Sequence, residues 1–180
     1  MLKISGIALA ILLGSIVLVV VIGYALPKKH ITARAIPLRQ KPAEVFALIS
    51  NFKEAPSWRP DVREVELLPP TNSRMRFVEK SKNGEITMEV MQTDSPQRLV
   101  TRVADSKLPF GGFWIFEILP APDGCRLNIT ERGEIYNPVF RFVSRFILGY
   151  SATLDTYLKN VARKFGSIAD PEDGRPAAEP

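Results

Sequence analysis

Hydrophobic and polar residues alternate along the middle of the chain with the period of a β-strand. The alternation recurs in six segments, which are residues 62–68, 73–82, 85–93, 98–105, 113–119 and 125–135. Asn83-Gly84 and Asp123-Gly124 lie between such segments and are residue pairs typical of tight hairpin turns. Because the connections have hairpin length, the pattern predicts an antiparallel meander and argues against β-α-β units.

More elements precede these segments. Residues 30–38 have the length and β-branched content of a strand, so the whole sheet is expected to have six to seven strands. Residues 41–50 follow as a short helix with Pro42 at its first position, where the missing N–H of proline costs nothing. A second short helix is expected before the meander begins.

The chain reads SWRPDV at the point where these short helices give way to the sheet. Pro56 and Pro60 disfavour helical backbone at the residue before each of them, and the first segment of the meander begins at about Val62. We therefore predict that Trp58 is a corner plug whose ring closes one end of the core. Contact of this ring with a ligand is the alternative.

Beyond the meander the pattern changes to the period of a helix. Asn137 is a good N-cap, Pro138 suits the first helical position, and Gly166 marks the end, so one helix is predicted from Pro138 to Phe165. Apolar residues recur along it at steps of three and four and form one stripe. A helix of about 28 residues is roughly 42 Å long, so the stripe needs the sheet as its partner.

The N-terminal segment Ile4–Leu26 contains no charged residue. Its 23 residues would reach roughly 34 Å as a helix, against a hydrocarbon core of about 30 Å. This predicts a transmembrane anchor, with a cleaved signal peptide as the alternative. Lys28 and Lys29 follow the segment, so the positive-inside rule places the remaining chain on the cytoplasmic side of the membrane.

Charge divides the rest of the chain. The formal net charge is +5, but the last fourteen residues hold four acids and one base, which leaves residues 1–166 at +8. We therefore predict three parts: an anchor with a basic juxtamembrane segment (1–29), one folded domain (30–166) and a disordered acidic tail (167–180). The basic charge suits anionic lipid headgroups, or is simply solvated surface charge. No interleaving of basic and aromatic residues points to nucleic acid.

The order of elements resembles the START-related superfamily, which includes polyketide cyclase/dehydrase-like proteins and the birch-pollen allergen. The resemblance rests on a strand, a short helix opening KPAEVFALISNF, the corner SWRPDV with the strand REVELL after it, five more antiparallel strands, and a long last helix ending TLDTYLKNVARKFG. It implies an α+β helix-grip fold, in which a curved antiparallel sheet wraps the C-terminal helix and leaves an apolar cavity. Members of the superfamily carry or modify lipids, sterols and polyketides.

Alternation within the strands indicates which side chains would line such a cavity. The candidates from strands and helix are Phe77, Met88, Thr101, Trp114, Phe116, Ile129, Glu131, Phe146, Tyr150 and Tyr157. The same alternation turns Glu79 and Gln92 inward, and a buried carboxylate needs a partner or a ligand. We expect Glu131, near Tyr150 or Tyr157, to orient the polar head of an apolar ligand, unless it simply reaches water at the end of its strand.

The start of the last helix, NPVFRFVSRFILGY, carries apolar residues on more than one face. In a membrane-tethered domain this excess would touch the bilayer interface, with Phe142 and Arg145 as contact candidates beside Lys28 and Lys29. The alternative is packing against the first helix and the loop at residues 109–112.

Catalytic signatures are weak. The single histidine, His30, follows the juxtamembrane lysines and is expected at the surface, and Cys125 follows a hairpin turn without a partner base. No metal, redox, ester-hydrolysis or phosphate-binding motif occurs in the sequence, so we predict no catalytic residue, metal site or cofactor. The favoured function is a membrane-anchored binding or transfer protein for a hydrophobic small molecule or lipid. The alternative is a cavity enzyme of the polyketide cyclase/dehydrase type.

Overall fold

The computed structural model describes residues 2–82 and 84–179, except for the side chains of residues 2–5 and 8. Helix α1 (Leu2–Ala25) leads to β1 (Lys29–Leu38), α2 (Pro42–Ser50) and a 3₁₀ helix, η1 (Phe52–Ser57). The meander consists of β2 (Val62–Thr71), β3 (Arg74–Ser81), β4 (Gly84–Asp94), β5 (Arg98–Val103), β6 (Phe110–Ala121) and β7 (Gly124–Ile135). The last elements are α3 (Pro138–Val143), a π-helical turn, η2 (Ser144–Leu148), α4 (Ala152–Lys164) and the short strand β8 (Glu172–Asp173).

All strands belong to one antiparallel sheet with the order β2-β3-β4-β5-β6-β7-β1-β8. The predicted meander from β2 to β7 is confirmed, and β1 returns to pair with β7. Gly84 and Gly124 have positive φ, as expected in the two hairpin turns, while Asn83 lies outside the described residues. The sheet has eight strands where six to seven were expected, because two residues of the tail add β8 to the edge of β1.

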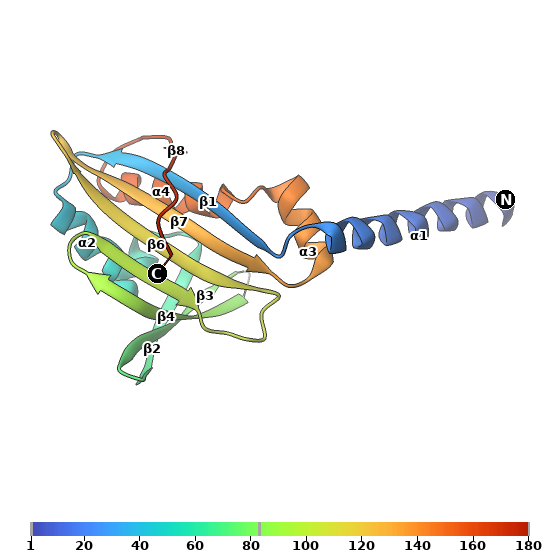
Figure 1. Ribbon diagram of the computed structural model, residues 1–180, viewed down its shortest axis with the longest axis horizontal. Helices are drawn as coiled ribbons and strands as arrows, with labels where there is room; N and C mark the ends of the chain where they lie inside the picture. Colours follow the sequence, from blue (N-terminus) through green and yellow to red (C-terminus); the bar gives the residue numbers. More distant parts are fainter. Residues whose placement is uncertain (1, 83, 180) are drawn as a thin grey trace.

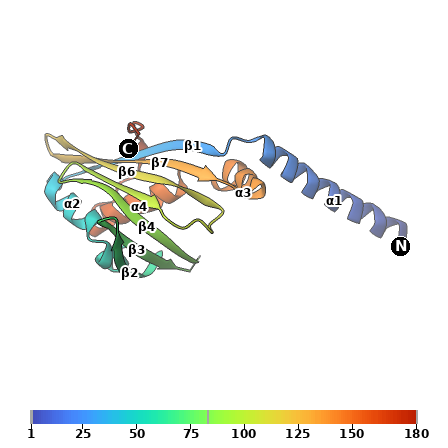
Figure 2. The same cartoon turned by 60° about the horizontal axis from the view of Figure 1, so that its bottom comes forward.

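The sheet curves around α4, which lies beneath β6 and β7 in Figure 2. We call the side toward α4 the concave face and the opposite side the outer face. Leu154, Leu158 and Val161 of α4 are fully buried in the core cluster that also holds residues of β1 and β7. Burying such a side chain stabilises the fold by about 1.5–3 kcal/mol. The predicted α+β helix-grip fold is confirmed.

The last helix is not one continuous helix, as was predicted for Pro138–Phe165. Its start is as expected, since the Asn137 side chain accepts a hydrogen bond from the Phe140 amide at 3.0 Å. The helix then widens into the π-helical turn η2 and stops at Gly149, whose φ of +75° is a left-handed conformation that suits glycine. Only α4, the second half, packs under the sheet.

Helix α1 leaves the domain at the end opposite α2 and points away from it (Figures 1 and 2). Its base is fixed on α3, where Arg141 donates a hydrogen bond from Nη1 to the Leu26 carbonyl at 2.8 Å. Gly23 lies directly against the Pro138 carbonyl, where a Cβ atom would find no space. Among the helices of the described residues, none has both the length and the apolar character that a bilayer span requires. The predicted transmembrane helix is therefore unsupported.

The C-terminal tail crosses the outer face, in front of β1, β7 and β6 in Figure 1. Arg126 pairs with Glu172, the Arg175 amide donates to Asn128 Oδ1 at 3.1 Å, and the Ala177 amide donates to Thr130 Oγ1 at 2.9 Å. These contacts differ from the disordered tail predicted for residues 167–180. Composition did not reveal that the outer face carries partners for an acidic, extended segment.

Candidate ligand-binding site

Strand pairing arranges the side chains of the concave face in rows that run across several strands. One row consists of Ile118, Leu127 and Ile36, and the next of Leu99, Phe116, Ile129 and Arg34. A third row consists of Val90, Thr101, Trp114, Glu131 and Thr32. Beyond it lie Met88 opposite Val103, and then Gly112, Gly133 and His30. The first strand thus belongs to the same wall as the meander.

The apolar side chains of this wall are less buried in the later rows, although Thr101 is 3% exposed and the His30 side chain 10%. The apolar side chains of the first two rows are at most 4% exposed, whereas Trp114, Met88 and Val103 of the later rows are half-buried. The reason is that α4 packs on β1 and β7 and does not cover the inward side chains of β4 and β5 in the later rows. Since β1 enters from α1, these later rows face the end of the molecule where α1 and α3 lie, which we call the open end (Figure 1).

An aromatic cluster forms the middle of the wall. The ring centroid of Tyr157 lies 5.7 Å from that of Trp114 and 5.5 Å from that of Phe116. Trp58 stands edge-on to Tyr157 at 5.4 Å and is 8% exposed, so it closes the end of the core opposite the open end. Its corner position agrees with the interpretation of SWRPDV.

A partly buried ion pair lies behind this cluster. Arg59 donates to both carboxylate oxygens of Glu79 at 2.7 and 3.0 Å, and its guanidinium lies 5.1 Å from the Tyr157 ring centroid. Burial lowers the pKa of Arg59, but the charge and hydrogen bonds of Glu79 outweigh burial and raise the pKa above its ordinary value. Burial also raises the pKa of the Tyr157 phenol far above its ordinary range. Arg59 therefore stays charged and Tyr157 stays neutral.

A second polar group stands at the open end. His30 Nε2 lies 3.3 Å from Glu131 Oε1, and the His30 ring stacks on Tyr150 with centroids 4.1 Å apart. The side chain of His30 is only 10% exposed. Gly133, which pairs with His30 across the strands, leaves the space that the imidazole occupies. The expected approach of Tyr150 toward Glu131 is therefore made through His30.

Sequence reasoning missed His30, because its neighbours along the chain are exposed lysines. The signal that could have identified it is the pairing of the first strand with the last, which places His30 opposite Gly133 and next to Glu131. Gln92 was wrongly placed on the concave face. A register shift between Val90 and Gln92 leaves Gln92 opposite Val100, which belongs to the outer face.

The other candidate residues fall at two places. Phe77 is buried on β3, where it stacks on Phe52 at 4.1 Å and has Met88 beside it, so it belongs to the wall. Phe146 is 59% exposed on η2, and its ring packs on that of Phe142 with centroids 5.0 Å apart, so it lies outside the wall. The π-helical turn that precedes Gly149 is the reason, since it interrupts the periodicity that placed Phe146 in the stripe.

The candidates for membrane contact lie on either side of the open end. Lys28 is exposed, and Lys29 forms an exposed ion pair with Glu134 at 3.6 Å. Phe142, in α3, is half-buried, and Arg145, in η2, is exposed.

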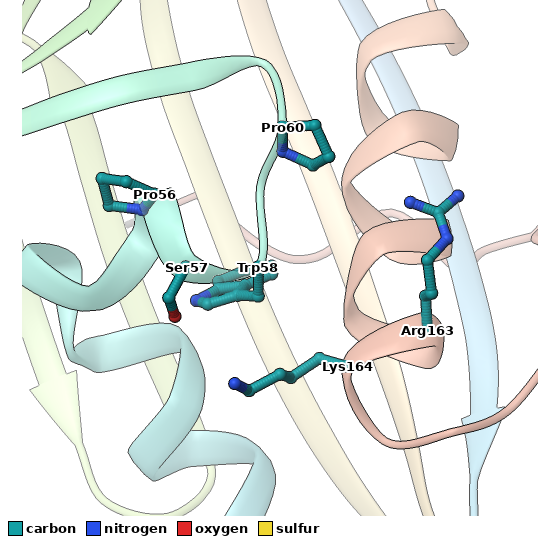
Figure 3. Close-up of a pocket in the computed structure, with 6 residues that line it drawn as sticks. All are labelled: Pro56, Ser57, Trp58, Pro60, Arg163 and Lys164. Atoms are coloured by element: carbon teal, nitrogen blue, oxygen red, sulfur yellow. The ribbon is translucent and has the colours of Figure 1, made fainter.

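Among the described residues, open clefts occur at two places on the border of the domain. One, of about 490 Å³, is lined by Pro56, Ser57, Trp58, Pro60, Arg163 and Lys164, between η1 and the last turn of α4 (Figure 3). The other, of about 360 Å³, lies at the edge of β3, β4 and β5 and includes Phe52, Val90 and Leu99 of the concave side. Neither contains Trp114 or Glu131, but the second reaches the edge of the wall at Val90 and Leu99.

Residues 30–166 match a protein family described as polyketide cyclase/dehydrase and lipid transport. A START superfamily protein from Mycobacterium smegmatis has a similar structure, with a TM-score of 0.55 and 16% identity over 75% of this chain and 99% of that chain. Truncated norcoclaurine synthase from Thalictrum flavum has a TM-score of 0.62 at 9% identity, over 76% of this chain and 93% of that chain. Comparison with curated proteins gives no match.

The di-domain ARO/CYC protein StfQ of the steffimycin biosynthetic pathway is also similar, with a TM-score of 0.57 and 13% identity over 74% of this chain and 50% of that chain. Identities at this level show a common fold and nothing more. The family match spans the whole helix-grip domain, and it agrees with the resemblance drawn from the order of elements. The chain belongs to the polyketide cyclase/dehydrase and lipid transport family.

Proposed function

We propose that the protein binds a hydrophobic small molecule or lipid against the concave face of its sheet. The observation that carries this proposal is the graded burial of the wall, which leaves Trp114, Met88 and Val103 half-buried although they point inward. Half-buried apolar side chains on a concave surface gain stability when a ligand removes them from water. The family description, which names lipid transport, supports the same substrate class.

The polar groups indicate how such a ligand would lie. The apolar part would run along Trp114 toward Phe116, while a polar head would meet His30, Glu131 and Tyr150 at the open end. Glu131 keeps one fifth of its side chain exposed, so it can accept a hydrogen bond from a ligand without first being stripped of all water.

The membrane belongs to the proposal as the source of the ligand. Exposed apolar side chains occur along α1, and on η2 Phe146, Ile147 and Leu148 are all more than half exposed. Both elements lie at the open end, so a bilayer held there would face the half-buried wall (Figure 1). We propose attachment through α1 with the domain on the cytoplasmic side, as the exposed Lys28 and Lys29 favour. Protease protection in vesicles would test the side and the depth of insertion.

Native mass spectrometry of the detergent-purified full chain tests the binding function. We expect a defined apolar molecule to remain bound, and Val103→Trp to displace it by filling the space in front of the wall. Leu119→Trp is the matched control, because Leu119 is exposed on the outer side of β6. Equal occupancy in both variants, or no bound molecule in the unmodified chain, would contradict the proposal.

Catalysis in the cavity is the second candidate function, and the contact between His30 and Glu131 favours it. A histidine held by a carboxylate beside an apolar wall can serve as a general base. Two structural neighbours carry enzyme names, a norcoclaurine synthase and an ARO/CYC protein. If the chain is an enzyme, turnover of a hydrophobic metabolite extract, followed by mass spectrometry, will be lost in Glu131→Gln and kept in Glu134→Gln. Binding without turnover in the unmodified chain would exclude catalysis and support the binding function.

A further inference from the structure

We propose that the cleft between η1 and the last turn of α4 binds an anionic group, a carboxylate or phosphate, of a water-soluble molecule. The cleft is lined by Pro56, Ser57, Trp58, Pro60, Arg163 and Lys164. It lies at the α2 end of the molecule and shares no lining residue with the half-buried wall. The two surfaces are connected where the Trp58 ring packs on the Tyr157 ring. The inference is independent of the ligand proposed for the concave face.

The indole N–H of Trp58 is the first reason. Trp58 is 92% buried, and among the described residues its Nε1 atom has no hydrogen-bond acceptor. Buried donors in folded proteins nearly always have a partner, because an unpaired one weakens the fold. Trp58 also lines the cleft, but its Nε1 atom is itself covered, so an acceptor bound there would satisfy this donor once the side chains over it move aside.

The charges of the cleft define which acceptor it suits. Arg163 and Lys164 are both exposed in the last turn of α4, and Lys164 forms no ion pair with any described residue. Asp61, the acid that follows the cleft residue Pro60, is already bound by Arg59 at 3.0 Å and by Asn160. The cleft therefore presents two cations and a hydroxyl, with the covered indole N–H of Trp58 behind them, and its neighbour Asp61 is already paired, which suits an anion.

The polar side chains that line the cleft also point in a direction that suits anion binding. Figure 3 shows the Ser57 hydroxyl, the Trp58 indole nitrogen and the Lys164 ammonium group pointing to the same side of the cleft, while Arg163 extends along α4. Arg163 is held there by a hydrogen bond to Asn160 Oδ1 at 2.9 Å. Lys164 is thus the cation placed to meet the anion, and Pro56 and Pro60 stiffen the opposite walls.

Position in the molecule favours a soluble anion over a lipid headgroup. The cleft lies at the end of the domain that carries α2, and α1 leaves from the other end (Figure 1). A bilayer that holds α1 would therefore lie at the far side of the domain from Lys164. A metabolite that carries its own carboxylate or phosphate can reach the cleft from water.

Indole resonances of the full chain in neutral detergent provide the test. The chain has two tryptophans, so a ¹H–¹⁵N spectrum shows two indole signals, and Trp114→Phe identifies that of Trp58. We expect the Trp58 signal to shift and saturate on addition of inorganic phosphate or acetate, but not of chloride at equal ionic strength. Lys164→Gln should weaken this binding about tenfold, as expected for loss of a charge-assisted contact.

Lys107→Gln is the matched control, since it removes the same charge from an exposed loop outside the cleft. Both variants alter exposed side chains and should leave the rest of the spectrum unchanged. A Trp58 signal that does not move, or equal weakening in both variants, would overturn the proposal. A response to micelle-inserted short-chain phosphatidic acid alone would overturn the assignment to a soluble anion and identify a headgroup instead.

Discussion

At the scale of single residues, the most consequential contact is the ion pair between Arg59 and Glu79. It is partly buried behind the aromatic cluster, and the Arg59 guanidinium also lies over the Tyr157 ring. Removing Glu79 leaves the Arg59 guanidinium, which is 13% exposed, with Asp61 as its remaining partner at 3.0 Å. The loss of the two hydrogen bonds from Arg59 to Glu79 should then destabilise the fold.

Glu79→Ala should therefore lower the free energy of unfolding by about 1–3 kcal/mol, below the range for fully buried pairs, because both partners are partly exposed and Asp61 still pairs with Arg59. Urea denaturation measures the change. Glu64→Ala is the control, since Glu64 pairs with Lys80 at an exposed site and should cost less than about 1 kcal/mol. Similar losses in the two variants would show that Arg59 does not depend on Glu79.

Tyr157 gives a prediction of pH dependence. Burial raises its pKa in the folded protein above the ordinary value of 10.0, so the unfolded chain loses this proton first as the pH rises. The contribution to stability is complete below pH 10 and decreases above it by about 1.4 kcal/mol per pH unit. Denaturation measured from pH 9 to 11 should show a shallower decline in Tyr157→Phe. An unchanged slope would mean that the phenol ionises equally in both states.

At the scale of elements, alternation predicted the wall well and the interruptions poorly. Phe77, Thr101 and Trp114 point inward as expected because strands alternate regularly over short stretches. The shift between Val90 and Gln92 and the stop at Gly149 break the two periods, and neither leaves a trace in hydrophobicity. The inward-facing residues of the site could be predicted where the strand and helix periods were regular, but not beyond the two interruptions.

Gly149 therefore provides a test of the helix break. Its φ is +75°, and no atom lies within 4 Å of the place of a Cβ, so alanine there meets only backbone strain. Gly149→Ala and Gly149→Asn should each cost about 1–3 kcal/mol in thermal or chemical unfolding, because a φ of +75° with a ψ of 155° is a backbone region that essentially only glycine adopts. Equal stability of all three proteins would indicate that the helix can be continuous.

The tail is an element that sequence composition misjudged. Ala177 is 5% exposed on the outer face beside Val100 and Ile115, both of which it helps to bury. Arginines of the sheet, including Arg126 and Arg132, bind tail carboxylates and carbonyls and so hold the segment in place. A polar, proline-containing segment can thus be ordered when the surface beneath it supplies both charge and apolar contact.

Ala177→Asp should release the tail, because it places a charge in an apolar patch, and should lower stability by about 1–3 kcal/mol. Hydrogen exchange would increase in β5 and β6, which the tail covers. Ala178→Asp is the neighbouring control, since Ala178 is exposed. If both variants exchange alike, the buried position of Ala177 has no role in holding the tail.

At the scale of the whole molecule, apolar exposure is concentrated at one end. The wall opens toward α1 and α3, and η2 presents Phe146, Ile147 and Leu148 nearby. The cationic cleft and Trp58 lie at the other end. The two ends therefore suit different surroundings, an apolar one beside α1 and water beside α2.

For a chain that begins after α1, Phe146→Asp should reduce flotation with anionic liposomes several-fold, because an aspartate opposes insertion at the interface. Leu119→Asp is the control, since Leu119 is similarly exposed near the β6–β7 turn. Unchanged flotation of Phe146→Asp in a folded protein would exclude η2 from membrane contact.

The hydrogen bond from Arg141 to the Leu26 carbonyl has a mechanical consequence. It joins the base of α1 to α3, and Gly149 separates that pair from α4, which is fixed in the core. Helices α1 and α3 are thus fixed to each other beside the sheet, where the Ile135 amide donates to the Lys28 carbonyl at 2.8 Å, and Tyr150, stacked on His30, directly follows Gly149. We expect a change in the tilt of α1 to act first on this junction, beside the rim of the wall.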